Sequence, residues 1–118
     1  MQNLQAEFEE KFNIVKNNFL KSLNEKYALL EFFKDLICKA ENLNDEKLID
    51  DFQEAYNCVH KLSGSSAMFG FNQLGNASVE LELLLKEFIK NNQTSNKTTI
   101  LQNLENLLNE IKKAIVLI

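Results

Sequence analysis

The chain contains one histidine, His60, at the start of a stretch that runs to Gly70. A neutral imidazole nitrogen is a good nucleophile near neutral pH, so this single side chain could carry covalent chemistry. It could equally be an idle surface residue. The residues that surround His60 must decide between these two interpretations.

Gly64 lies one helical turn after His60, although a glycine inside a helix costs about 1 kcal/mol relative to alanine. Together with Ser63 and Ala67 it forms a patch of small side chains beside the ring. A partner protein could bring its own active site close to His60 over such a patch. The alternative is that Gly64 lets another helix pack closely, but Gly64 falls outside the predicted core face.

Residues 52–69 form an amphipathic helix when they are placed on a wheel of about 100° per residue. His60 lies roughly 130° from the centre of the apolar side, so we expect its ring to face water. The side that should face the core consists of Phe52, Ala55, Val59, Leu62, Ser66 and Phe69.

These residues resemble the signature of the histidine phosphotransfer (HPt) domains, which carry phosphoryl groups in bacterial and eukaryotic phosphorelays. The signature has a histidine, a hydrophobic residue two positions later and a glycine four positions later. Small residues, a hydrophobic–glycine pair and a Leu-Glu pair follow. In this chain it reads His60, Leu62, Gly64, Ser65, Ser66, Phe69, Gly70, Leu74, Leu81 and Glu82.

The resemblance implies that His60 is the phosphorylated residue and that Glu82 orients its ring from the facing helix. It also implies that a basic residue one turn after Glu82, here Lys86, holds phosphoryl oxygens. Glu82 and Lys86 could instead form an ordinary i,i+4 ion pair, which contributes about 0.2–0.5 kcal/mol. Many members have lysine three residues after the histidine, where this chain has Ser63. Ser63, Lys86 and Lys61 are therefore the candidate phosphoryl contacts, although Lys61 points well round the helix and could simply be solvated.

The resemblance further implies a phosphocarrier that is not itself an enzyme. The expected partners are response-regulator receiver domains and a hybrid sensor histidine kinase, and the receiver would supply the aspartate and the Mg²⁺. We expect no cofactor or metal site in the chain itself, and no glycine-rich ATP-binding loop is present. The alternative function is a non-catalytic helical bundle that binds a protein partner as an adaptor. The residues expected to contact the partner are Tyr56, Asn57, Gly64, Ala67 and Phe71.

The elements that must position these residues are all helices. The chain has 118 residues, no proline and three glycines, which favours a single all-α domain over residues 1–118. Apolar residues recur at steps of three and four from Leu4 to Ile37, and we expect a break near residues 22–24, where Ser and Asn can act as caps.

A second helix is expected over about 45–69 and should end at Gly70. A third helix is expected from a cap at Asn72 to a loop at 91–96. The last helix is expected over 100–115. The predicted fold is an antiparallel up-and-down four-helix bundle with an extra or extended N-terminal helix. The apolar stripes of the last two helices are Leu74, Ala77, Leu81, Leu84, Leu85 and Phe88, followed by Ile100, Leu101, Leu104, Leu107, Leu108, Ile111 and Ile115.

The composition argues against several classes of protein. A net charge of −4 argues against a nucleic-acid partner, because such a protein would need a basic surface. We expect no membrane span and no signal peptide, because the sequence has neither a long apolar run nor the pattern of a leader. Cys38 and Cys58 are expected to be two small buried side chains. These features predict a cytoplasmic protein, and we expect it to be a monomer.

Overall fold

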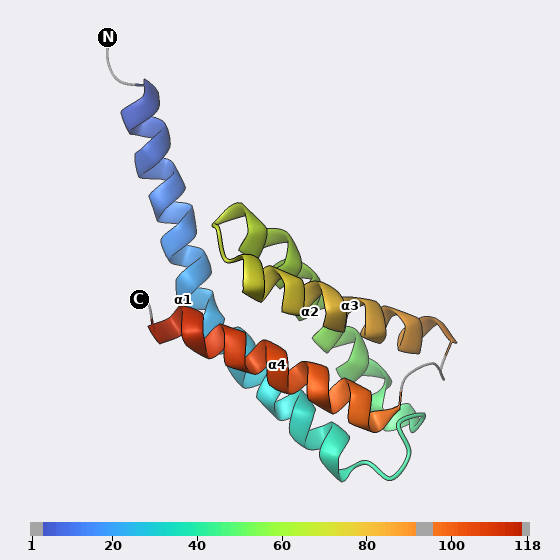
Figure 1. The fold of residues 1–118 in the computed structure, drawn as a ribbon. Helices are drawn as coiled ribbons and strands as arrows, with labels where there is room; N and C mark the ends of the chain where they lie inside the picture. The colour runs from blue at the N-terminus through green and yellow to red at the C-terminus, as the bar shows by residue number, and fades with distance from the viewer. Residues whose placement is uncertain (1–3, 92–95, 117–118) are drawn as a thin grey trace.

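The computed structural model describes residues 4–91 and 96–116. It contains four long helices joined by short connections (Figure 1). A short 3₁₀ turn, η1, precedes the second long helix. The elements are α1 (Leu4–Lys39), η1 (Glu46–Leu48), α2 (Ile49–Met68), α3 (Asn72–Asn91) and α4 (Lys97–Val116).

The helices form an antiparallel up-and-down bundle, as the sequence predicts. α2 packs on α1 and α3, and α4 packs on α3 and α1, so that each helix has two neighbours. Figure 1 shows that the first part of α1 extends beyond the other three helices. The N-terminal helix is therefore extended, and no extra helix is added among the described residues.

The core lies along the axis of the bundle and consists mainly of Leu, Ile and Phe. Burial of this surface drives the fold, because each helix carries one apolar stripe that needs partners. Leu84 and Ala77, which the sequence placed on the stripe of α3, are only partly buried. The fully buried large side chains are Phe33, Leu23, Leu30, Ile37, Leu62, Leu81, Leu85, Ile100, Leu104, Leu107, Ile111 and Val59.

The predicted break near residues 22–24 is wrong, because α1 is continuous from Leu4 to Lys39. The hydroxyl of Ser22 donates a hydrogen bond to the backbone carbonyl of Phe19 at 2.7 Å, so it does not cap a new helix. Leu23 is fully buried, and the uninterrupted helix keeps Phe19 and Leu23 on the same side. At 36 residues α1 is about 54 Å long, which accounts for most of the 62 Å length of the molecule.

Aromatic rings hold α1 against the turn between α2 and α3. The ring of Phe69 lies 5.3 Å from that of Phe12 and 5.2 Å from that of Phe19, measured between centroids. Phe71 lies 6.1 Å from Phe19, and the ammonium of Lys16 sits 5.9 Å above the Phe71 ring. This cluster fixes the position of α1 along its axis relative to the turn between α2 and α3.

The turn after α2 forms as the sequence predicts at Gly70. The N–H of Gly70 bonds to the carbonyl of Ala67, and the N–H of Phe71 bonds to the carbonyl of Ser66. This is a Schellman arrangement, and Gly70 has the positive φ of 84° that it requires. Asn72 is not the cap of α3, because the first helical bond runs from the N–H of Gly75 to the carbonyl of Phe71.

The other ends of the bundle are closed by polar contacts. Asp45 caps η1 by accepting a hydrogen bond from the N–H of Lys47 at 3.0 Å, so the expected helix start at residue 45 becomes a short 3₁₀ turn followed by α2. The ammonium of Lys97, at the start of α4, donates to the carbonyls of Cys38 and Ala40 at 2.8 and 2.9 Å. A cation at the C-terminal end of α1 is favourable because the free carbonyls there are negative.

None of the helices in the described residues has an apolar stretch long enough to span a bilayer. Over the same residues, no group of three or more acidic, histidine or cysteine side chains is arranged to hold a metal ion.

The two cysteines are free and differ in exposure. Cys58 is buried, as expected, and burial raises the pKa of its thiol to about 11. The expectation that Cys38 is buried is wrong: it lies on the exposed side of α1, one residue beyond buried Ile37.

The two thiols should therefore react at very different rates with an aqueous thiol reagent. At pH 8 a pKa of about 11 leaves only about one Cys58 in a thousand as thiolate, and burial hinders access as well. We expect one fast equivalent of thiol in the folded protein, two after unfolding, and no fast equivalent in Cys38→Ser. Two fast equivalents in the folded protein would contradict the packing of α2 described above.

Candidate functional site

His60 projects from α2 into solvent, as the helical wheel predicts, and 65 % of its side chain is exposed. The opposite side of α2 is buried throughout and fixes the rotation of the helix about its axis. The core residues predicted for this side are all buried: Phe52, Ala55, Val59, Leu62, Ser66 and Phe69.

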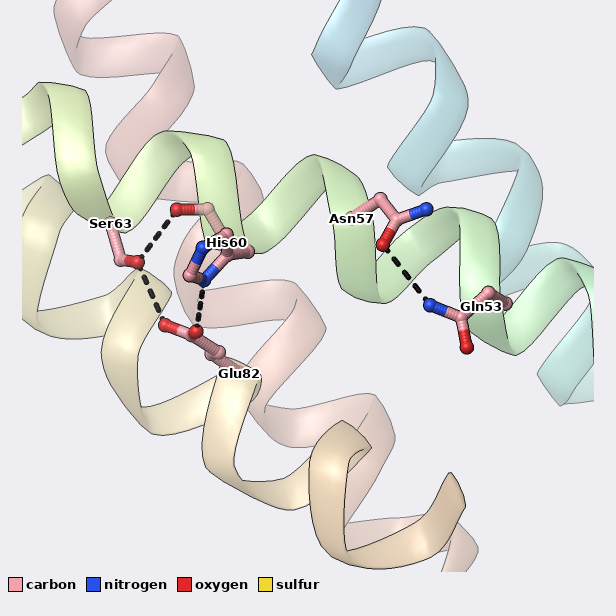
Figure 2. A network of polar contacts seen from close by, with 5 residues as sticks. All are labelled: Gln53, Asn57, His60, Ser63 and Glu82. Atoms are coloured by element: carbon pink, nitrogen blue, oxygen red, sulfur yellow. Dashed lines mark hydrogen bonds and ion pairs between the residues drawn. The ribbon is translucent and has the colours of Figure 1, made fainter. Parts of the chain in front are cut away.

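Glu82 reaches across from α3 to the ring of His60 (Figure 2). Its Oε2 lies 2.5 Å from Nδ1 of the imidazole. A carboxylate can only accept at this position, so the bond keeps the proton on Nδ1. The other ring nitrogen, Nε2, then carries a free electron pair in the neutral ring, which is the form a nucleophile needs.

Ser63 fixes the second oxygen of the same carboxylate. Its hydroxyl lies 2.7 Å from Oε1 of Glu82 and 2.9 Å from the backbone carbonyl of His60 (Figure 2). A hydroxyl has one proton, so the two acceptors share it. Ser63, a candidate phosphoryl contact by sequence, is thus directed toward Glu82, and both carboxylate oxygens are held.

Charge and hydrogen bonding keep Glu82 ionised. Partial burial raises the pKa of Glu82, but the hydrogen bonds from His60 and Ser63, with the positive charges of His60 and Lys86, outweigh it and hold this pKa below the usual value. Lys86 is exposed and lies one turn after Glu82 on α3, so it is close enough to act on the carboxylate. Its position is consistent with a phosphoryl contact.

Lys61 occupies a different face of α2. It lines a hollow of about 350 Å³ between α1 and α2, together with Lys26, Glu54, Asn57 and Cys58. The structure therefore brings Ser63 and Lys86 to Glu82 but leaves Lys61 beside α1.

The surface around His60 is low on the side of Gly64. A Cβ added at Gly64 would meet no atom within 4 Å, which rules out close helix packing as the reason for this glycine. Ala67, one turn further, is exposed. On the other side the ring of Tyr56 stacks on the imidazole with 5.9 Å between centroids and 17° between planes. Sequence spacing placed Tyr56 beside His60, but the stacking was not predicted.

The remaining predicted contact residues lie further from the ring. Asn57 accepts a hydrogen bond from the side chain of Gln53 at 3.1 Å and lines the hollow beside α1 (Figure 2). Phe71 belongs to the turn after α2 and packs on Phe19. It is half-buried there, so it lies in the aromatic cluster and not beside the ring.

Gly75 on α3 is buried against α2, although the space there would accept a Cβ in ordinary contact. A Cβ at this position would lie 3.6 Å from Cβ of Ser66 and 3.7 Å from the backbone nitrogen of Ala67. Ser66 and Ser78 are both fully buried, and the hydroxyl of Ser78 donates a hydrogen bond to the carbonyl of Leu74 at 2.8 Å. The burial of Ser66 was predicted from the helical wheel, whereas the burial of Gly75 and Ser78 was not, although the small size of these residues was a signal for it.

The family model of the Hpt domain matches residues 17–114, which is most of the chain. The chain belongs to the HPt family. Searches of the curated proteins and of the solved structures found no match. Membership of the family gives this chain a general role as a histidine phosphocarrier in phosphorelay and two-component signalling. The single histidine of this chain is His60.

Because the space at Gly64 is open, substitutions there can test separately the stability of this HPt domain and the access of a partner to His60. Gly64→Ala should raise the free energy of unfolding by about 1 kcal/mol, because alanine is the better helix former and its Cβ meets nothing. Gly64→Gln should keep the helix content, measured by circular dichroism, but slow phosphotransfer several-fold relative to Gly64→Ala. Equal transfer rates in the two variants would show that the low surface is irrelevant.

The bond to Glu82 should be visible in the pH dependence of stability. Glu82→Gln should lower the free energy of unfolding by about 1 kcal/mol at pH 7, because a charged acceptor is lost. A lowered folded pKa stabilises the protein above the ordinary value of 4.5, and this contribution disappears as the pH falls through the folded pKa. The difference in the free energy of unfolding between Glu82→Gln and wild type, measured by urea unfolding, should therefore become smaller below about pH 4.5.

Glu80→Gln, at an exposed position of the same helix, serves as the control for this comparison. Glu82→Ala should also slow phosphotransfer without abolishing it, and the ¹⁵N spectrum of the His60 ring should show a mixture of tautomers. An unchanged tautomer would remove Glu82 from the role of orienting the ring.

Proposed function

We propose that this HPt domain accepts a phosphoryl group on Nε2 of His60 from a receiver aspartate and passes it to the aspartate of a response regulator. The observation that carries the proposal is the bond between Nδ1 of His60 and Glu82. It presents a single, solvent-facing nitrogen in the correct tautomer.

In the proposed transfer, one bond to phosphorus forms and another breaks. Nε2 attacks the phosphorus of the aspartyl phosphate, the N–P bond forms, and the P–O bond to the aspartate breaks to release a carboxylate. The proton stays on Nδ1, and Glu82 stabilises the positive charge that the ring gains. The second transfer reverses these steps on another receiver.

The partner supplies most of the catalysis in this proposal. A receiver domain brings its aspartate and Mg²⁺, and the metal neutralises the phosphoryl oxygens during the transfer. Within this chain Lys86 is the lysine whose positive charge acts on Glu82. Ser63 is committed to Glu82 and contributes no positive charge.

The donor in this proposal is the receiver of a hybrid sensor histidine kinase. The chain has no glycine-rich phosphate loop and only three glycines, so direct transfer from ATP on this chain is not part of the proposal. The proposal also places the protein in the cytoplasm.

The test is transfer from a phosphorylated receiver to the purified protein. We expect an acid-labile, alkali-stable phosphoryl group on wild type and none on His60→Gln, because glutamine offers no nucleophilic nitrogen. Lys90→Gln, at an exposed position near the end of α3, should match wild type. Phosphorylation of His60→Gln to the level of wild type, or no phosphorylation of wild type by any receiver, would leave an adaptor role as the better explanation.

A further inference from the structure

The first turns of α1 extend past the bundle (Figure 1). They present large apolar side chains to solvent. Leu4 is 83 % exposed, Phe8 66 % and Val15 53 %. On a helical wheel these three residues fall within about 40° of each other, so they form one stripe. A contiguous apolar stripe on the surface marks an interaction site more often than a single exposed leucine does.

This segment contacts the bundle through Phe12. The ring of Phe8 stacks on Phe12 at 6.1 Å between centroids, and Phe12 packs on Phe69 of the α2–α3 turn. The match to the family model begins at residue 17, so the stripe lies outside the part that the HPt family shares. We call residues 4–16 the α1 extension.

The charges of α1 are separated along its length. Residues 4–10 contain three acidic side chains and no basic one, whereas residues 11–24 contain three basic side chains and no acidic one. Two such helices repel each other when they run parallel and attract each other when they run antiparallel. The charged residues are Glu7, Glu9, Glu10, Lys11, Lys16 and Lys21.

One flank of the stripe is also complementary to itself. Glu7 and Lys11 are four residues apart, so they lie on the same side of the helix, next to the stripe. A two-fold axis perpendicular to a pair of antiparallel helices brings each flank against its own copy. Glu7 of one chain then faces Lys11 of the other, and the same contact occurs a second time.

We propose that the α1 extension pairs antiparallel with the α1 extension of a second copy. The two Phe8 rings lie near the two-fold axis, and Glu7 of each chain pairs with Lys11 of the other. The monomer expected from the sequence is thereby replaced by a weak dimer, because the interface involves only a few turns of each chain. His60 and Glu82 lie on α2 and α3, so neither belongs to the α1 extension.

Sedimentation equilibrium over a range of protein concentrations tests the proposal. We expect wild type to approach twice the monomer mass, and Phe8→Glu to raise the dissociation constant at least about tenfold, because it places two carboxylates near the axis. Phe32→Glu is the matched control: Phe32 is also on α1 and 62 % exposed, but it lies outside the α1 extension. It should dimerise as wild type does.

A charge-reversal series tests the orientation without touching the apolar stripe. Glu7→Lys and Lys11→Glu should each weaken the dimer several-fold, because each makes the flank repel its own copy. The double variant Glu7→Lys/Lys11→Glu should restore wild-type affinity within about twofold, since its flank is again self-complementary.

Several results would overturn the proposal. These are a wild type that stays monomeric at every concentration, a dimer disrupted by Phe32→Glu but not by Phe8→Glu, and a double variant no tighter than the singles. A monomer whose Phe8→Glu form loses affinity for a receiver would assign the stripe to that partner instead. None of these measurements depends on phosphotransfer, so they stand apart from the test of His60.

Discussion

The close approach of α2 and α3 is the constraint on which the site depends, because His60 and Glu82 come from different helices. Gly75 lies on the side of α3 that faces α2, where a Cβ would make ordinary van der Waals contact with Cβ of Ser66 and the backbone nitrogen of Ala67. The Schellman turn at Gly70 then reverses the chain within a few residues, so that α3 begins beside the end of α2. His60 and Glu82 lie at similar distances from this turn, so their side chains meet at the same level.

Burial fixes the remaining freedom of the site. Helix α2 cannot rotate about its axis without exposing Phe52, Val59 and Leu62, which are in the core. His60 is therefore held outward by the burial of the other side of α2. The stacking on Tyr56 and the bond to Glu82 then restrict the ring, so that in the proposed mechanism the nucleophile is oriented before a partner binds.

In the proposed mechanism, Ser63 leaves the phosphoryl group without a positive charge at the position three residues after His60. Its hydroxyl holds Glu82, so this position strengthens the orientation of the ring and adds no cation. Lys61 faces the hollow beside α1, and Lys86 remains as the cation near the carboxylate. In the mechanism proposed here, the metal of the receiver therefore carries most of the charge compensation.

The sequence by itself determined the helical class, the buried side of α2, the turn at Gly70 and the exposure of His60, because each follows from the spacing of neighbouring residues. Glu82 was identified only through the family signature. Tertiary structure decided that Ser63 bonds to Glu82, that Lys61 points away and that Gly75 is buried against α2, because these depend on contacts between helices. It also decided that α1 continues through Ser22: local capping preferences favoured a break, but burial of Phe19 and Leu23 on one uninterrupted helix outweighed them.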